Sequence, residues 1–204
     1  MGRNRRQFVL YGGAIAGASL LAIGILSLPL GLEPSESDSS SFNRLPNAIL
    51  QSQDGKSYRF YDDLVKDKIV AINFFYTECR NVCPLTTQNL AEAQRLLGGR
   101  VGRDIFIYSI TLQPETDTPE VIKEYVEVYD VLPGWLFLRG SRADTDMLRR
   151  KFGLASSDPA IDVDPNQHTG NIWFSNDATD RWAASTPFAS PEEIVETLLS
   201  VAPA

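Results

Sequence analysis

Apolar residues between positions 47 and 204 follow two patterns, one typical of strands and one typical of helices. Residues 69–76 form an apolar run in which Asn73 is the one polar residue, as a strand that is buried on both faces requires. Asp54 and Gly55 separate two short segments, residues 48–51 and 57–60, and predict a β-hairpin between them. The other predicted strands cover residues 105–111, 135–138, 171–175 and 181–184, the last two forming a second hairpin.

Four segments show helical spacing together with start or stop signals. One opens at Pro119 and is expected to bury Val121, Tyr125 and Val128 on one face. Another begins with a capping box at Ser190. The predicted helices cover residues 84–97, a segment starting at 119, 144–152 and 191–199.

The order of these elements predicts the class of fold. Strands alternate with helices through most of the chain, and a hairpin and a last helix follow. We therefore expect an α/β, thioredoxin-like fold with an extra N-terminal β-hairpin.

The N-terminal residues 1–32 have a different composition. The pair Arg5 and Arg6 precedes 25 residues, 8–32, without a charge, which resembles a twin-arginine export signal and is long enough to span a bilayer. No clear cleavage site follows it, so we expect a membrane anchor with its N-terminus inside. Residues 33–46 are rich in serine and predict a flexible linker. The folded domain is then 47–204, exported and held on the outer face of the cytoplasmic membrane.

Charge narrows the classes of partner. The whole chain has a net charge of -7, and outside residues 1–32 it carries 16 Lys and Arg against 26 Asp and Glu. Such an acidic domain without a basic run argues against binding to nucleic acid.

The two cysteines of the chain, Cys79 and Cys83, lie between the apolar run and the next predicted helix. Pro84 suits a first helical position, so Cys83 is expected at the N-cap and Cys79 in the preceding loop. Free N–H groups at a helix start favour a thiolate, which both disulfide exchange and soft metals require. This spacing is typical of a redox pair or of two ligands for one metal ion, and less typical of two inert buried thiols.

His168, the single histidine, stands in a loop before a predicted strand. A lone histidine is more often a hydrogen-bonding residue than a ligand, but a thioredoxin-like topology brings this loop to the helix that follows the cysteines. Cys79, Cys83 and His168 would make a three-coordinate site that suits copper(I). Structural zinc usually takes four protein ligands, and Met147 is expected in the core.

These motifs resemble the SCO/SenC family of thioredoxin-like copper proteins, over roughly residues 47–199. The family pattern Phe-x-Tyr-Thr-x-Cys-x-x-x-Cys-Pro is met by residues 74–84, and a segment like Asp-Pro-x-x-Asp-Thr-Pro is represented by residues 114–119. The sequence departs from the family at Arg80 and Asn81, where Pro and Asp are frequent, and at Gln113 and Gln167, where Asp is frequent. The resemblance implies copper, as Cu(I) or Cu(II), bound by Cys79, Cys83 and His168.

The resemblance also implies a function and partners. We expect a copper metallochaperone that serves the CuA centre of cytochrome c oxidase subunit II, with a copper donor chaperone and a thioredoxin-like reductant as further partners. The alternative is a membrane-tethered thiol-disulfide oxidoreductase, which would not need His168. A thiol peroxidase is disfavoured because Thr77 lies two residues before Cys79 rather than three. A redox sensor stays open.

Overall fold

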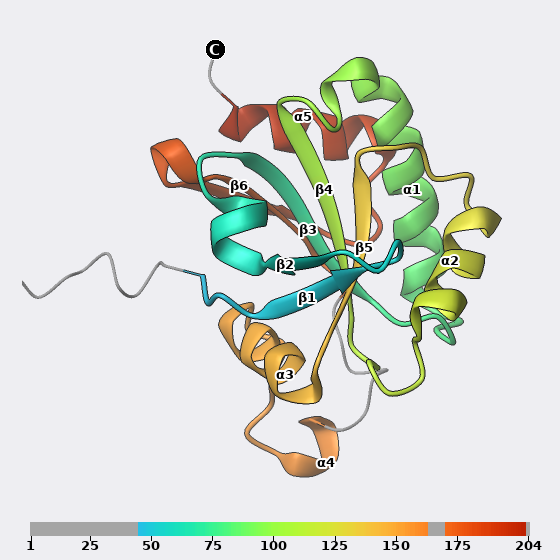
Figure 1. Cartoon of the computed structure of the whole chain (residues 1–204). Coiled ribbons are helices and arrows are strands. Elements are labelled where there is room, and N and C mark those ends of the chain that lie inside the picture. The colour runs from blue at the N-terminus through green and yellow to red at the C-terminus, as the bar shows by residue number, and fades with distance from the viewer. Residues whose placement is uncertain (1–44, 163–169, 203–204) are drawn as a thin grey trace, which may run out of the picture. The chain divides into compact units, whose positions relative to one another are not determined.

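Seven strands form one mixed sheet in the part of the chain that the structure, a computed structural model, describes (Figure 1). The described residues are 45–162 and 170–202. The strand order is β2-β1-β5-β4-β3-β6-β7, in which β3, β4 and β5 run parallel and the other neighbours pair antiparallel. The strands are β1 (Ile49–Ser52), β2 (Ser57–Arg59), β3 (Ile69–Phe75), β4 (Ile105–Thr111), β5 (Trp135–Gly140), β6 (Ile172–Asn176) and β7 (Arg181–Ser185).

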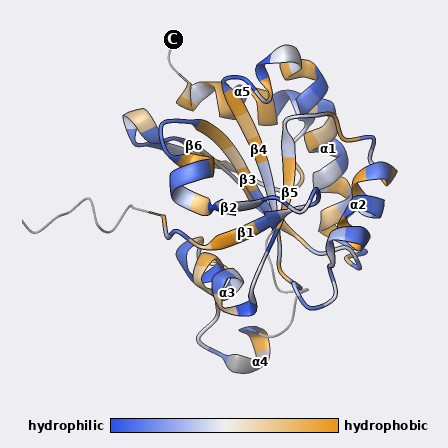
Figure 2. Cartoon of the chain, viewed as in Figure 1, coloured by the Kyte–Doolittle hydropathy of each residue, from blue (hydrophilic) through white to orange (hydrophobic). Residues whose placement is uncertain are grey.

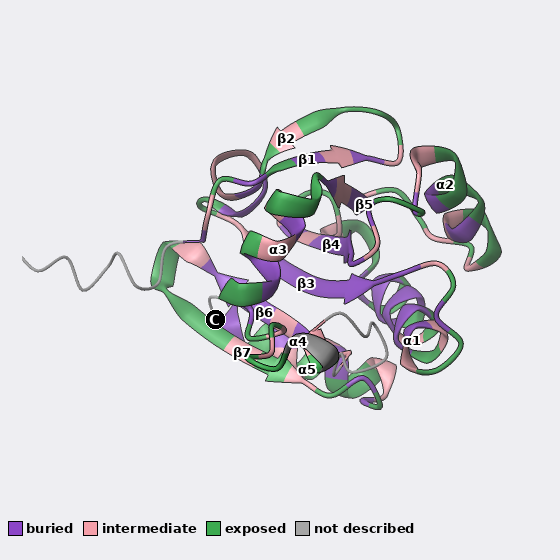
Figure 3. Cartoon of the chain, turned by 90° about the horizontal axis from the view of Figure 1, so that it is seen from below, coloured by how far each residue is buried: buried purple, intermediate pink, exposed green. Residues whose placement is uncertain are grey.

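Helices cover both faces of this sheet. The two parallel crossovers both step away from β3, so right-handed connections put α1 and α2 on the same face. Helix α5 packs against α1 and therefore shares that face, whereas α3 lies on the opposite one (Figures 1 and 3). The helices are α1 (Val82–Leu97), α2 (Pro119–Val128), α3 (Arg142–Lys151), the short α4 (Pro159–Asp162) and α5 (Pro191–Val201).

Strand β3 lies at the centre of the core. All its residues after Ile69 are buried, and Figure 3 shows the strand buried along its length. Consecutive side chains of a strand point to opposite faces of the sheet, so the last two residues of β3 pack against the helices on opposite faces. Phe74 packs edge-on against Phe152 at the end of α3, and Phe75 packs against Tyr125 of α2. The central strand is thus held by aromatic contacts on both sides just before the cysteines.

The predicted thioredoxin-like α/β fold is confirmed, including the extra N-terminal hairpin β1–β2. The predicted strands and helices agree with the observed ones to within two residues. Figure 2 shows the reason, since the central strands are mostly apolar while the helices alternate between apolar and polar faces. The predicted membrane segment lies outside the described residues. Among residues 45–162 and 170–202, no helix is both long and apolar enough to cross a membrane.

Two expectations about burial are wrong. Helix α2 buries Ile122 and Tyr125, while Val121 is partly exposed and Val128 is 77% exposed. Helix α2 packs on Phe75 and β5 in such a way that Ile122, rather than Val121, points into the core. Met147, expected in the core, is 42% exposed, because the buried side of α3 is made by other residues.

The cap of α5 allows a test of the fold. The Ser190 hydroxyl accepts the Glu193 N–H, and the Glu193 carboxylate accepts the Ser190 N–H. Ser190→Ala should lower the free energy of unfolding by about 1 kcal/mol, measured by urea titration. Ser200→Ala, which removes only a bond to the Thr197 carbonyl one turn back, should cost less than about 0.5 kcal/mol. Equal losses in the two variants would contradict the capping role.

Candidate functional site: a buried cysteine pair

The cysteine pair lies at the carboxyl end of β3, in the connection to α1. Cys79 follows a tight turn in which its N–H donates to the Tyr76 carbonyl over 3.2 Å. Helix α1 starts at Val82 with Asn81 as its N-cap, so Cys83 is the second helical residue. The expected place of Cys83 at the N-cap is therefore wrong by two positions. Pro84 is compatible with this start because N–H groups in the first helical turn have no partner within the helix.

Both cysteines are free and buried, with exposed fractions of 7% for Cys79 and 6% for Cys83. Each thiol shifts the pKa of the other through a side-chain interaction, so the structure places the two thiols close to each other. The structure therefore brings together the two residues that the sequence predicted as the redox pair. A loop at the end of a buried parallel strand is a usual place for a functional site in α/β folds.

The two thiols differ in acidity. Burial raises the pKa of Cys79, but hydrogen bonds from the Cys83 thiol, from the N–H groups of Asn81 and Cys83 and from the Tyr76 hydroxyl outweigh it, so its pKa is lowered. Burial raises the pKa of Cys83, and the hydrogen bond to Cys79 and the negative charge of Asp117 raise it further. Cys79 is therefore the thiol that ionises first and Cys83 the one that keeps its proton.

A group of polar side chains beneath the loop was not recognised from the sequence. The fully buried carboxylate of Asp117 accepts hydrogen bonds from Thr77, two residues before Cys79, and from Thr111 at the end of β4. The only sequence signal was the Asp-Thr-Pro segment before α2. Its partners are 6 and 40 residues away, so no local pattern connects them.

His168, the third predicted ligand, lies outside the described residues. In the two described ranges, no group of three or more His, Cys, Asp or Glu side chains is placed to hold a metal ion. The described chain resumes at Gly170, where a Cβ atom would come within 3.0 Å of Val82 and 3.1 Å of Pro187. Gly170 thus packs against the residue that precedes Cys83.

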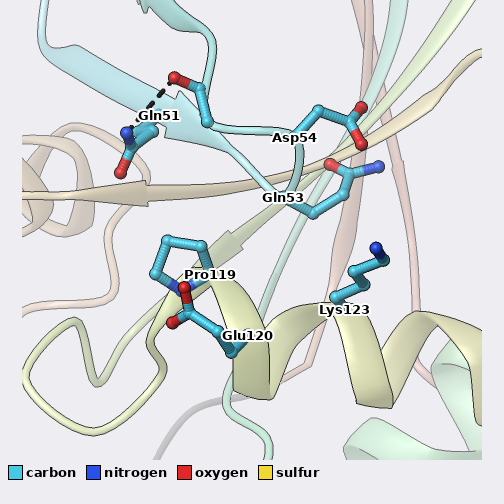
Figure 4. Close-up of a pocket in the computed structure, with 7 residues that line it drawn as sticks. Gln51, Gln53, Asp54, Pro119, Glu120 and Lys123 are labelled. Atoms are coloured by element: carbon cyan, nitrogen blue, oxygen red, sulfur yellow. Dashed lines mark hydrogen bonds between the residues drawn. The ribbon is translucent and has the colours of Figure 1, made fainter.

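A polar pocket of about 540 Å³ lies elsewhere, between the β1–β2 turn and the first turn of α2. Figure 4 shows Asp54 and Gln53 above it and Glu120 and Lys123 below, with the Gln51 amide bonded to the Gly55 carbonyl. None of its lining residues belongs to the cysteine loop, and its lining contains no thiol. The pocket and the cysteine pair are therefore separate features.

The sheet, the helices and a Cys-x-x-x-Cys loop after the central strand define a thioredoxin-like protein with a dithiol site. The chain belongs to the SCO1/SenC family, whose model matches residues 49–202. This confirms the resemblance seen in the sequence.

Three similar proteins illustrate the relationship. A SCO1 protein homolog of Bacillus subtilis is 30% identical over 91 residues, which are 44% of this chain and 46% of that protein, so the chain spans about half of its length. The structure of Bradyrhizobium japonicum ScoI with copper bound is 25% identical, has a TM-score of 0.61, and is matched over 77% of this chain and 99% of ScoI. BsSco, described as a member of the Sco family of cytochrome c oxidase assembly proteins with a disulfide switch, is 21% identical with a TM-score of 0.61 over 78% of this chain and 94% of BsSco.

The difference in acidity predicts unequal reactivity. Because the thiolate is the nucleophile, iodoacetamide should modify Cys79 at least about tenfold faster than Cys83 at neutral pH. The rate at Cys79 should level off at a pH below the ordinary thiol pKa, whereas the rate at Cys83 should still rise above that pH. Peptide mass spectrometry after timed alkylation of the reduced protein measures both rates. Faster modification of Cys83 would contradict the assignment.

Proposed function

We propose that this chain binds copper through Cys79, Cys83 and His168 and delivers it to the CuA centre of cytochrome c oxidase subunit II. The observation that carries the proposal is the buried, reduced pair Cys79 and Cys83 at the end of β3, in a chain of the SCO1/SenC family. Similarity to a ScoI that binds copper supports the choice of metal. Thiolates are also the ligands that select copper(I).

The geometry of the described residues is compatible with this ligand set. Copper(I) would be held by both sulfurs as thiolates, so binding of the metal releases the protons that the thiols carry, above all the Cys83 proton. Gly170, two residues after His168, packs against Val82 beside Cys83, which supports His168 as the third ligand. At the other side of the 163–169 segment, the buried Arg149 binds the Asp162 carboxylate over 2.9 Å and its carbonyl over 2.7 Å. Both flanks of the segment that carries His168 are thus anchored.

The second candidate function is a thiol-disulfide oxidoreductase for cysteines of the same client. The observation that favours it is the close pair of thiols with unequal acidity, since one more nucleophilic thiol and one that keeps its proton suit disulfide exchange. BsSco is described as having a disulfide switch, which supports a redox role beside copper binding. A copper donor chaperone and a thioredoxin-like reductant are the further partners that these two functions require.

A copper titration distinguishes the two functions. The reduced chain should bind one copper(I), and Cys79→Ala or Cys83→Ala should abolish this binding. His168→Ala should weaken copper(I) binding and should weaken copper(II) binding more, because the harder ion depends more on nitrogen. The measurement is competition with a chelator of known affinity, in which each tenfold loss corresponds to about 1.4 kcal/mol.

The reductase function predicts the opposite role for His168 in cells. Thiol-disulfide exchange should continue in His168→Ala, since it needs only the two thiols. Oxidase activity at limiting copper is then the deciding readout in cells that lack the native protein. Full restoration by His168→Ala but not by Cys79→Ala would favour the reductase and contradict copper delivery.

We also propose that residues 1–32 export and anchor the protein, that residues 33–46 are its linker and that the 47–204 domain lies on the outer face of the cytoplasmic membrane. The support is the paired Arg5 and Arg6 before 25 uncharged residues.

Replacement of Arg5 and Arg6 by Lys should block export, because the twin-arginine route reads the arginine pair as an address. The domain of the parent chain should be cleaved by protease added outside spheroplasts, and that of the double variant should be protected. Unchanged cleavage of the variant would contradict the twin-arginine route and leave the anchor as a separate question.

A further inference from the structure

A buried carboxylate lies beneath the cysteine loop without a basic partner. Asp117 is fully buried, and it forms no ion pair with a Lys or Arg of the described ranges. Burial of a carboxylate is costly unless hydrogen bonds satisfy its oxygens. Its contacts are therefore expected to have a specific role.

Hydroxyl and N–H donors surround this carboxylate. The Thr77 hydroxyl donates to one oxygen over 2.5 Å, and the Thr77 N–H lies 3.3 Å from both oxygens. The Thr111 hydroxyl donates to the other oxygen. The oxygen of Thr111 itself accepts the Gln113 N–H over 3.0 Å, which leaves the hydroxyl proton directed at Asp117.

These bonds connect the ends of three elements around the cysteines. Thr77 lies two residues after β3 and two before Cys79, and Thr111 is the last residue of β4. Asp117 directly precedes Thr118, the N-cap of α2, whose hydroxyl accepts the Val121 N–H. Through Thr77, the loop that carries Cys79 is thus hydrogen-bonded to Asp117, whose own position is fixed by β4 and α2.

We propose that Asp117 is a positioning residue of the cysteine site, whose carboxylate holds Thr77 and thereby keeps Cys79 and Cys83 close to each other. Without the hydrogen bonds to Asp117, the loop samples more conformations. Forming the Cys79–Cys83 disulfide then costs more conformational entropy. Two thiols held close to each other have a high effective concentration and form their disulfide more readily. The negative charge of Asp117, which opposes ionisation of Cys83, is consistent with its closeness to the pair.

The test is the equilibrium between the Cys79–Cys83 disulfide and dithiothreitol, measured without copper on the full chain in detergent. Reduction breaks the protein disulfide, and dithiothreitol supplies two electrons and two protons as it closes into its own cyclic disulfide. Thr77→Val keeps the shape of the side chain but removes the hydroxyl donor. It should lower the equilibrium constant for forming the protein disulfide about tenfold, which corresponds to about 30 mV. Asp117→Asn should shift it in the same direction.

Thr77→Ser is the matched control, because it retains the hydroxyl, and its equilibrium constant should stay within about threefold of the parent. Asp104→Asn, which alters an exposed carboxylate paired with Arg100, should have no effect. Circular dichroism and thermal unfolding establish that each variant is folded, and if Asp117→Asn does not fold, the two Thr77 variants decide. A value for Thr77→Val within about twofold of the parent, or equal shifts in Val and Ser variants, would overturn the proposal. Copper is absent, so this result is independent of the copper titration.

Discussion

The close placement of Cys79 and Cys83 is the constraint on which the rest of the site depends. It exists because β3, a strand buried on both faces, ends in the interior rather than at the surface. The chain must then cross from the core to the start of α1 with its polar backbone groups satisfied. The Cys79 sulfur, the Tyr76 carbonyl and the Asp117 carboxylate accept N–H groups of this loop, which therefore has a defined conformation although both of its thiols are buried.

Secondary structure was predictable because local signals agreed with the tertiary structure. Mostly apolar runs identified β3 and β4, and prolines or capping serines marked the starts of α2 and α5. The single π-helical turn at Phe60–Val65 was missed, since six residues with two adjacent aspartates give no helical period. The buried side of α2 was misjudged because Val121, Ile122 and Tyr125 are all apolar, and only the packing against β5 selects among them.

Only the part of the site that is formed by residues close together in the sequence could be predicted. The Cys-x-x-x-Cys-Pro spacing and the strand before it predict a redox pair, and the structure places both cysteines, free and buried, directly after β3. The departures from the family pattern at Arg80 and Asn81 fall on exposed positions between the two buried cysteines, so they alter the surface around the pair rather than the pair itself. The carboxylate beneath the loop could not be predicted, because its bond to Thr77 joins residues 40 positions apart.

The unequal acidity of the thiols has a consequence for the proposed role of copper as cargo. Capture of the metal by both sulfurs requires the Cys83 proton to leave, against the effects of burial and of Asp117 that raise its pKa. The metal must compensate for this cost, so the same features that keep Cys83 protonated in the reduced protein also favour release of copper when a proton returns. A storage site would gain from two thiolates of low pKa. A delivery site requires the opposite balance, because a cargo held too strongly cannot be transferred. Two thiols of unequal acidity, buried together at the end of β3, provide that balance and also suit disulfide exchange, which explains why the two proposed functions are compatible with the same pair.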